Sequence, residues 1–171
     1  QKYLGILAGA AILALGGLTW LISSARRSTG PDERWRRSIG DDQISLLNAR
    51  GEFIHTAPGA RSRRAAKALR MFRSVLGASL RSRASDIHFE PESHDGSIRM
   101  RVDGVMVDVE TVTSELMRRM LSLVKVLCDI DITKRHIVQE GHYSAVVSRQ
   151  NIDCRVSFTP VVHGQKLVIR I

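Results

Sequence analysis

Residues 84–110 carry the strongest fold signal in the chain and read ASDIHFEPESHDGSIRMRVDGVMVDVE. In the first part of this stretch, Ile87 and Phe89 alternate with polar neighbours until Pro91 interrupts the pattern. Successive side chains of a strand point to opposite faces of a sheet. The alternation therefore predicts a strand with one buried face and one polar face.

The second part of the same stretch predicts a hairpin. Apolar and polar residues alternate over 98–102, and a run rich in valine occupies 105–109. Asp103 and Gly104 separate the two runs. An Asp-Gly pair in this position is typical of the tight turn that joins two antiparallel strands.

Two amphipathic helices are expected on either side of these strands. Apolar residues recur at intervals of three and four over 63–82 and 114–128, which places them on one helical face. They are Leu69, Phe72, Leu76 and Leu80 in the first helix and Leu116, Met120, Val124 and Leu127 in the second. Three further short strands are predicted at 143–147, 152–158 and 166–171. This order of elements predicts an α+β domain with a mostly antiparallel sheet.

Composition limits the chain to one domain of ordinary size with an appendage. Of its 171 residues, 43% are hydrophobic and 25% are charged, which is too apolar for a disordered protein. The 2 cysteines, Cys128 and Cys154, are too few for a disulfide framework, and no Cys/His spacing resembles a zinc site. The chain shows no glycine-rich phosphate loop ending in Gly-Lys-Ser or Gly-Lys-Thr, so we predict that it is not itself an ATPase.

Positive charge is concentrated in the first half. Residues 26–83 contain 14 Lys and Arg against 5 Asp and Glu, whereas 84–171 contain 11 against 12. Residues 3–22 carry no charge and are long enough to cross the ~30 Å core of a bilayer as a helix. We therefore predict a transmembrane segment over 1–25, a basic juxtamembrane linker over 26–62 and a folded domain over 63–171.

The arginines that follow the apolar stretch predict its orientation. By the positive-inside rule they place the bulk of the chain in the cytoplasm, as a single-pass protein of the cytoplasmic membrane. They also favour contact with anionic lipid over nucleic acid, because the predicted membrane segment directly precedes them. These residues are Arg26, Arg27, Arg34, Arg36 and Arg37. A cleaved signal peptide, with Ser23-Ser24-Ala25 as its cleavage site, is the alternative.

Two groups of polar side chains on the predicted strands are candidates for chemistry. Asp86, His88 and Glu90 share one strand face, which fits either a metal site or a polar outer face. The lack of a cysteine or helical histidine partner favours the polar face and no metal. Arg99 and Arg101 share a face of the next strand. Their guanidinium groups could bind phosphate oxygens, or they could simply lie on a strand face exposed to water. The residues alone leave both interpretations of the arginine pair open.

Several segments resemble, in order, the signatures of the type II secretion and type IV pilus assembly ATPases. Residues 84–91 are similar to the family's A-S-D-I-H-x-E-P, and RMRVDG over 99–104 is similar to R-x-R-x-D-G. Lys125, the Gln-Glu-Gly of 139–141 and the DCRVS of 153–157 follow in the family's order. Pro160, Gly164 and Arg170 complete the resemblance, which covers residues 64–171. The chain departs from the family at His136 and His142, where arginines are common.

The resemblance implies a non-catalytic domain that precedes a RecA-like ATPase core and folds as a PAS-like unit. Members of the family form hexamers in which this domain packs on the core of a neighbouring subunit. The implied cofactors, ATP and Mg²⁺, belong to the parent assembly and not to this chain. The implied partners are the core, the neighbouring subunits and inner-membrane platform proteins. A stand-alone regulatory or scaffolding domain that binds the motor without hydrolysing ATP is the alternative.

The resemblance also implies roles for individual residues. In the family, arginines of this domain approach the phosphates of the bound nucleotide. The matching candidates here are Arg99, Arg101, Arg155 and Arg170. The motif residues with implied structural roles are Asp86, His88, Glu90, Pro91, Asp103, Gly104, Gln139 and Gly141.

Overall fold

A computed structural model describes residues 40, 43–54 and 60–171 of the chain. Alternating apolar residues form strands over much of this part. Seven strands and two helices follow one another in this part of the chain. They are β1 (Ile44–Leu47), α3 (Ala60–Ser82), β2 (Ala84–Pro91), β3 (Asp95–Val102), β4 (Val105–Thr113), α4 (Ser114–Leu127), β5 (Gln139–Val147), β6 (Gln150–Val161) and β7 (Gly164–Arg170).

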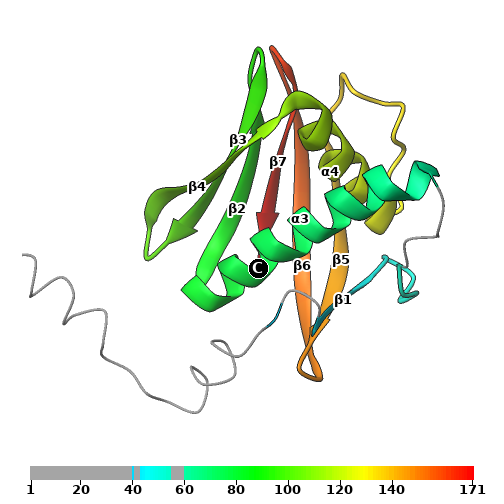
Figure 1. Ribbon diagram of the computed structural model, residues 1–171, viewed down its shortest axis with the longest axis vertical. Coiled ribbons are helices and arrows are strands. Elements are labelled where there is room, and N and C mark those ends of the chain that lie inside the picture. The colour runs from blue at the N-terminus through cyan, green and yellow to red at the C-terminus, as the bar shows by residue number, and fades with distance from the viewer. Residues whose placement is uncertain (1–39, 41–42, 55–59) are drawn as a thin grey trace, which may run out of the picture. The chain divides into compact units, whose positions relative to one another are not determined.

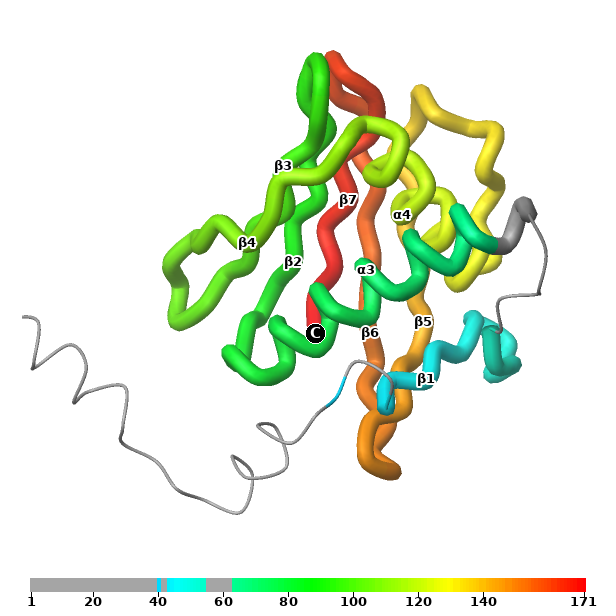
Figure 2. Tube along the Cα trace, in the orientation of Figure 1, coloured from blue at the N-terminus to red at the C-terminus, as the bar shows by residue number. Residues whose placement is uncertain are grey.

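The seven strands form one sheet in the order β1-β5-β6-β7-β2-β3-β4 (Figure 1). Each neighbouring pair is antiparallel. The last strand of the described chain, β7, lies between β6 and β2 and joins the two halves of the sheet (Figure 2). The predicted α+β class with a mostly antiparallel sheet is therefore confirmed.

Both helices lie across one face of this sheet, and the core fills the space between them (Figure 1). Phe72 of α3 is fully buried, and its ring centroid lies 6.1 Å from that of Phe89 on β2 and 6.1 Å from that of Tyr143 on β5. Ile98 and Leu167 bring the neighbouring strands into the same layer. Burial of this apolar surface is the main favourable term in folding.

Local signals place the element boundaries close to those predicted. The helix expected over 114–128 ends one residue earlier, and it begins after Thr113, whose hydroxyl oxygen accepts a hydrogen bond from the backbone N–H of Leu116 at 3.4 Å. Asp103 and Gly104 have φ values of 49° and 82°, so both central residues of the turn are left-handed. This is the tight hairpin geometry that an Asp-Gly pair favours.

Strand β1 comes from a stretch that the sequence interpretation assigned to the linker. Ile44 and Leu46 are 0% and 1% exposed, so alternate residues of this strand point into the core. The strand extends the sheet by pairing with β5, from Ile44 opposite Val147 to Leu47 opposite Ser144. The folded unit therefore includes residues before 63.

The predicted single-pass location in the cytoplasmic (inner) membrane is corrected by the described helices. None of them is both long enough and apolar enough to cross a membrane. Helix α3 has 23 residues but carries charged residues such as Lys67 and Arg70, and α4, with 14 residues, rises only about 21 Å. Residues 1–25, on which that prediction rested, lie outside the described part of the chain.

Candidate functional site

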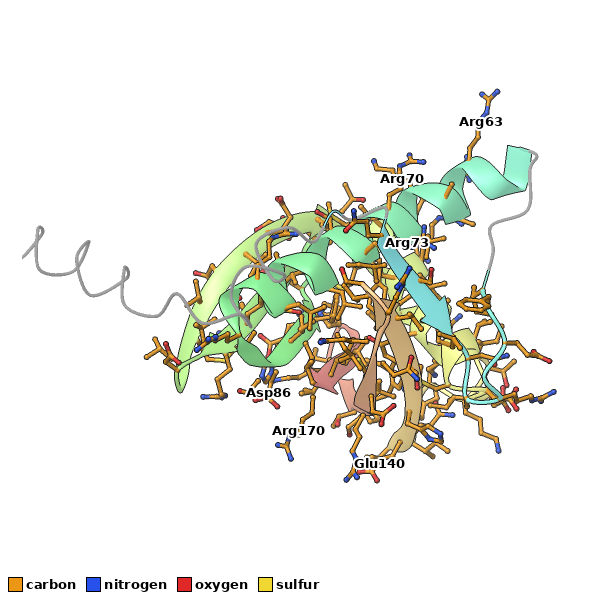
Figure 3. The ribbon with its side chains drawn as sticks, turned by 90° about the horizontal axis from the view of Figure 1, so that it is seen from below. Arg63, Arg70, Arg73, Asp86, Glu140 and Arg170 are labelled. Atoms are coloured by element: carbon orange, nitrogen blue, oxygen red, sulfur yellow. The ribbon has the colours of Figure 1, made fainter. Side chains whose placement is uncertain are left out.

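The face of the sheet that points away from α3 and α4, here called the outer face, carries the polar half of each strand. On β2, Ile87 and Phe89 face the helices and are 0% exposed, so the alternation directs Asp86 and Glu90 to the outer face. Figure 3 shows Asp86, Arg170 and Glu140 on this side, whereas Arg63 and Arg70 project from α3 on the other.

Strand register brings residues that are far apart in sequence into one transverse row on this face. Asp86 lies opposite Arg101 of β3 on one side and opposite Arg170 of β7 on the other. Arg170 in turn lies opposite Arg155 of β6, which lies opposite His142 of β5. Directly opposed residues of antiparallel strands have neighbouring side chains on the same face. Three of the four predicted arginines therefore share one row.

The carboxylate of Asp86 lies between two arginines of this row, Arg101 and Arg170. Its Oδ1 is 3.3 Å from Arg170 Nε, its Oδ2 is 3.7 Å from Arg101 Nε, and the Ser85 hydroxyl donates to Oδ2 at 2.7 Å. Burial raises the pKa of Asp86, but the hydrogen bonds from Ser85 and Arg170 outweigh it and leave the pKa below its ordinary value. Asp86 is therefore an anion with arginine on both sides.

A second carboxylate repeats the arrangement four residues further along β2. Glu90 pairs with Arg99 of β3 and with Lys166 of β7. Burial raises the pKa of Glu90, but hydrogen bonds from Lys166 and Arg99 outweigh it, so the net pKa is lowered. Both carboxylates of β2 thus hold cations from the strands on either side.

His88 lies between these two carboxylates and opposite Arg99. Burial lowers the pKa of His88 and the charge of Lys166 lowers it further, against the opposite effects of Glu90 and Asp86. The ring is therefore mostly neutral at pH 7. Its two nitrogens have no hydrogen-bond partner among the residues that the structure describes.

Asp86, His88 and Glu90 of this strand are also the candidate metal ligands of the sequence. The described residues contain no group of three or more His, Cys, Asp or Glu side chains placed to hold an ion. Asp86 and Glu90 are instead engaged by arginine and lysine. The polar face is held together by ion pairs.

Along most of the row, the outer face is hollowed into a concavity of about 1030 Å³ that runs over β5, β6, β7 and the start of β2. Arg155 and Arg170 line it, together with Asp86 and His142. Arg155 is exposed and has no acidic partner among the described residues. The paired N–H donors of arginine side chains in such a concavity can bind anionic groups, phosphate above all.

The arginines remain accessible although they are paired. The side chains of Arg99, Arg101 and Arg170 are 36%, 40% and 76% exposed, whereas those of Asp86 and Glu90 are 12% and 19% exposed. The carboxylates are therefore more buried than the guanidinium groups and bind them on the side that faces the sheet. This arrangement can present several fixed cations to one anionic ligand.

Other motif residues lie away from the outer face. Asp103 and Gly104 form the β3–β4 turn, where the Gly104 carbonyl accepts from Arg101 at 3.1 Å. The Gln139 side-chain oxygen accepts from Lys125 Nζ at 2.7 Å. A Cβ on Gly141 would lie 2.9 Å from Cys128 Cβ, so this glycine permits close packing.

The sequence interpretation missed the roles of Ser85 and Lys166. Both bind the carboxylates of β2, Ser85 through Asp86 and Lys166 through Glu90. The alternation of Lys166, Val168 and Arg170 along β7 is the signal that would place Lys166 on the outer face. Its partner depends on strand order, which local pattern does not give.

We expect acid to lower the free energy of unfolding of the chain through Asp86 and Glu90 of the outer face. Asp86 and Glu90 have lowered pKa values in the folded chain, so their stabilisation is complete above the ordinary carboxyl pKa and is lost as pH falls through the lowered values. We expect the urea midpoint to fall between about pH 5 and about pH 3. In an Asp86→Asn, Glu90→Gln double variant this fall should be shallower.

Two exposed acids outside the row provide the matched control for this experiment. Glu92→Gln combined with Asp103→Asn changes the same residue types in turns. The control should keep the acid-dependent fall of the wild-type chain. Equal slopes for the wild type and the Asp86, Glu90 variant would show that these pairs do not stabilise the fold.

Comparison with known proteins matches most of the folded unit. A family model described as "Type II/IV secretion system protein" matches residues 62–171. The type II secretion system ATPase E of Vibrio cholerae serotype O1 is 30% identical over 146 residues, covering 85% of this chain and 29% of that protein.

Two further relatives are also secretion or pilus proteins that the chain matches over part of their length. The type II secretion system protein E of Pseudomonas aeruginosa is 36% identical over 103 residues, 60% of this chain and 20% of that protein. The type IV pilus assembly ATPase PilB of Myxococcus xanthus is 32% identical over 134 residues, 78% of this chain and 23% of that protein. The chain thus spans less than a third of the length of the curated relatives it matches.

Proposed function

This chain belongs to the family of type II/IV secretion system proteins, and we propose that it serves as a non-catalytic domain of a secretion or pilus motor ATPase. In this role it packs, as a PAS-like unit, against the ATPase core of a neighbouring subunit in a hexamer. Its proposed partners are that core and the other subunits of the motor. The row of arginines on the outer face is the observation that carries the proposal.

The proposed chemistry of the row is electrostatic. ATP hydrolysis spreads negative charge over the phosphate oxygens in the transition state, and fixed cations lower the energy of that charge. Arg101 and Arg170 are held by Asp86 at 3.7 and 3.3 Å, so less side-chain freedom is lost when they meet a phosphate. The core supplies the nucleotide and Mg²⁺, and this domain adds positive charge from outside.

Arg99 on β3 and Arg155 on β6 are further candidates for the proposed contact with phosphate. Arg99 lies on the same strand face as Arg101, paired with Glu90, and Arg155 lies beside Arg170 in the concavity. A single triphosphate cannot engage every guanidinium in one geometry. The accessible members nearest to the nucleotide are therefore expected to dominate, and substitution of each arginine in turn ranks them.

The chain on its own is expected to show no ATP turnover above background. Phosphoryl transfer needs a phosphate cradle and a Mg²⁺ site, and the outer face offers cations without a described metal-ligand group. The measurement is phosphate release by the purified 171-residue chain, with the full-length motor protein as the positive control. Turnover that disappears on substitution of a residue within 84–171 would contradict the proposed role.

A further inference from the structure

A second concavity lies on the helix side of the sheet, remote from the outer face. It has a volume of about 570 Å³ and is bounded by α4, the segment 128–138 and the β6–β7 hairpin, with part of α3 at its end. We call it the α4 pocket. Its size falls within the range of ligand-binding cavities in proteins.

The floor of the α4 pocket is apolar. Met117 and Leu121 line it and are 1% and 8% exposed, and Pro91 closes one side. The apolar surface continues outward at Val126 and Ile132, which also line the pocket and are 51% and 50% exposed. Large apolar side chains exposed together around a hollow are typical of binding surfaces.

The side-chain amide nitrogen of a buried glutamine in the same pocket has no partner within the described part of the chain. Gln165 of β7 is 7% exposed and lines the pocket, and its Nε2 has no hydrogen-bond partner among the described residues. A buried donor without an acceptor costs about 1–3 kcal/mol. A bound group that supplies an oxygen acceptor would remove this cost.

The charges around the pocket favour an anionic acceptor. Its lining includes Arg118, Arg119, Lys125 and Arg135, and Glu115 is the one carboxylate among these lining residues. That carboxylate is already engaged, because Arg119 Nη2 lies 2.7 Å and Arg64 Nη1 3.7 Å from Glu115 Oε1. The remaining cations attract negative charge from outside.

One wall of the pocket is fixed by a buried lysine. Lys125 is 3% exposed, and its Nζ donates to the Lys134 carbonyl at 2.8 Å and to Gln139 Oε1 at 2.7 Å. These bonds tie the segment that carries Ile132 and Arg135 to α4 and β5. The pocket therefore has a wall with little freedom to collapse, which favours binding.

We propose that the α4 pocket binds an apolar segment of another protein that carries a carboxylate side chain. The apolar side chains of the segment lie on Met117 and Leu121, and its carboxylate accepts a hydrogen bond from Gln165 Nε2 within the cationic rim. A protein segment, rather than a small molecule, is the occupant because the segment that walls the pocket exposes further large apolar side chains outside its lining, Ile137 and Val138, which are 51% and 58% exposed. This inference goes beyond the arginine row, which lies on the opposite face.

The test is an NMR titration of the ¹⁵N-labelled 171-residue chain with a blocked peptide, acetyl-Ser-Leu-Leu-Glu-Leu-Ser-amide. We expect saturable shifts at the Gln165 side-chain amide and along α4, with a dissociation constant below about 1 mM. The same peptide with Gln in place of Glu should bind at least about 5-fold more weakly. A version with Lys in place of Glu should bind more weakly still, because the rim is cationic.

Variants of the chain separate the pocket from other surfaces. Gln165→Met keeps a similar volume without the donor and should weaken binding at least about 5-fold. Gln150→Met, at the start of β6, is the matched control and should bind like the wild type. A thermal melt of each variant checks that the chain is folded before the titration.

Three results would overturn this proposal. They are the absence of saturable shifts around the pocket, equal binding of the Glu and Gln peptides, and unchanged binding by a folded Gln165→Met chain. Octanoate carries the same chemistry in a free small molecule, and tighter binding of octanoate than of the peptide would also overturn the protein occupant. None of these results bears on the arginine row, whose own test is ATP turnover.

Discussion

Replacing Arg101 by alanine is expected to lower ATP turnover of the full-length motor protein by about 10-fold or more. An arginine that stabilises the transferring phosphoryl group contributes about 10³–10⁵ in the best cases, and the expected loss is smaller because other arginines share the face. Arg101 is 40% exposed, and its guanidinium is held between Asp86 and the Gly104 carbonyl. The measurement is steady-state phosphate release at saturating ATP.

The stability of the isolated chain separates a role at the nucleotide from a role in folding. The Arg101–Asp86 pair is partly exposed, so its loss should cost no more than about 1 kcal/mol. Arg63→Ala, on the exposed side of α3, is the control and should leave turnover unchanged. If Arg101→Ala unfolds the chain while turnover per folded molecule stays constant, the arginine is structural and the proposed role fails.

Replacing Phe72 by alanine is expected to destabilise the chain by about 3–5 kcal/mol. The side chain is fully buried between α3 and the sheet, with its ring 6.1 Å from both Phe89 and Tyr143. It therefore links the two halves of the sheet, since β2 and β5 lie on opposite sides of β7. A loss of this size is a large share of the stability of a small domain.

Urea unfolding followed by circular dichroism measures this loss. The matched control is Phe53→Ala, because Phe53 is the same residue type but is 54% exposed. The control should change the free energy of unfolding by less than about 1 kcal/mol. Similar losses for the two variants would mean that the packing around Phe72 does not support the fold.

The parts of the fold that depend on neighbours along the chain could be predicted from the sequence. The spacing of apolar residues gave α3 and α4 to within a few residues, and Asp103-Gly104 gave the β3–β4 turn. Strand β1 was not predicted as part of the domain because its 4 residues offer little alternation and pair with β5, about a hundred residues later. Strand order likewise depends on contacts that no local pattern encodes.

In the candidate site, too, the sequence predicts what depends on neighbouring residues but not what depends on strand order. Alternation alone predicted that Arg99 and Arg101 share a face and that Ile98 and Met100 face the core, where they are 0% and 3% exposed. It could not predict that Asp86 would meet Arg170, 84 residues away, because that contact requires β7 to lie beside β2. The role of these arginines at a nucleotide stays a prediction.

The position of β7 has a consequence for how the chain is made. Synthesis delivers β1 to β4 first, then β5 and β6, and only afterwards the 7 residues of β7 that pair with both β2 and β6. A nascent chain that stops before residue 164 holds two incomplete sheets, each with an unpaired edge. Open edges of this kind are where growing chains associate with one another instead of folding. The domain is therefore most exposed to aggregation on the ribosome until β7 emerges.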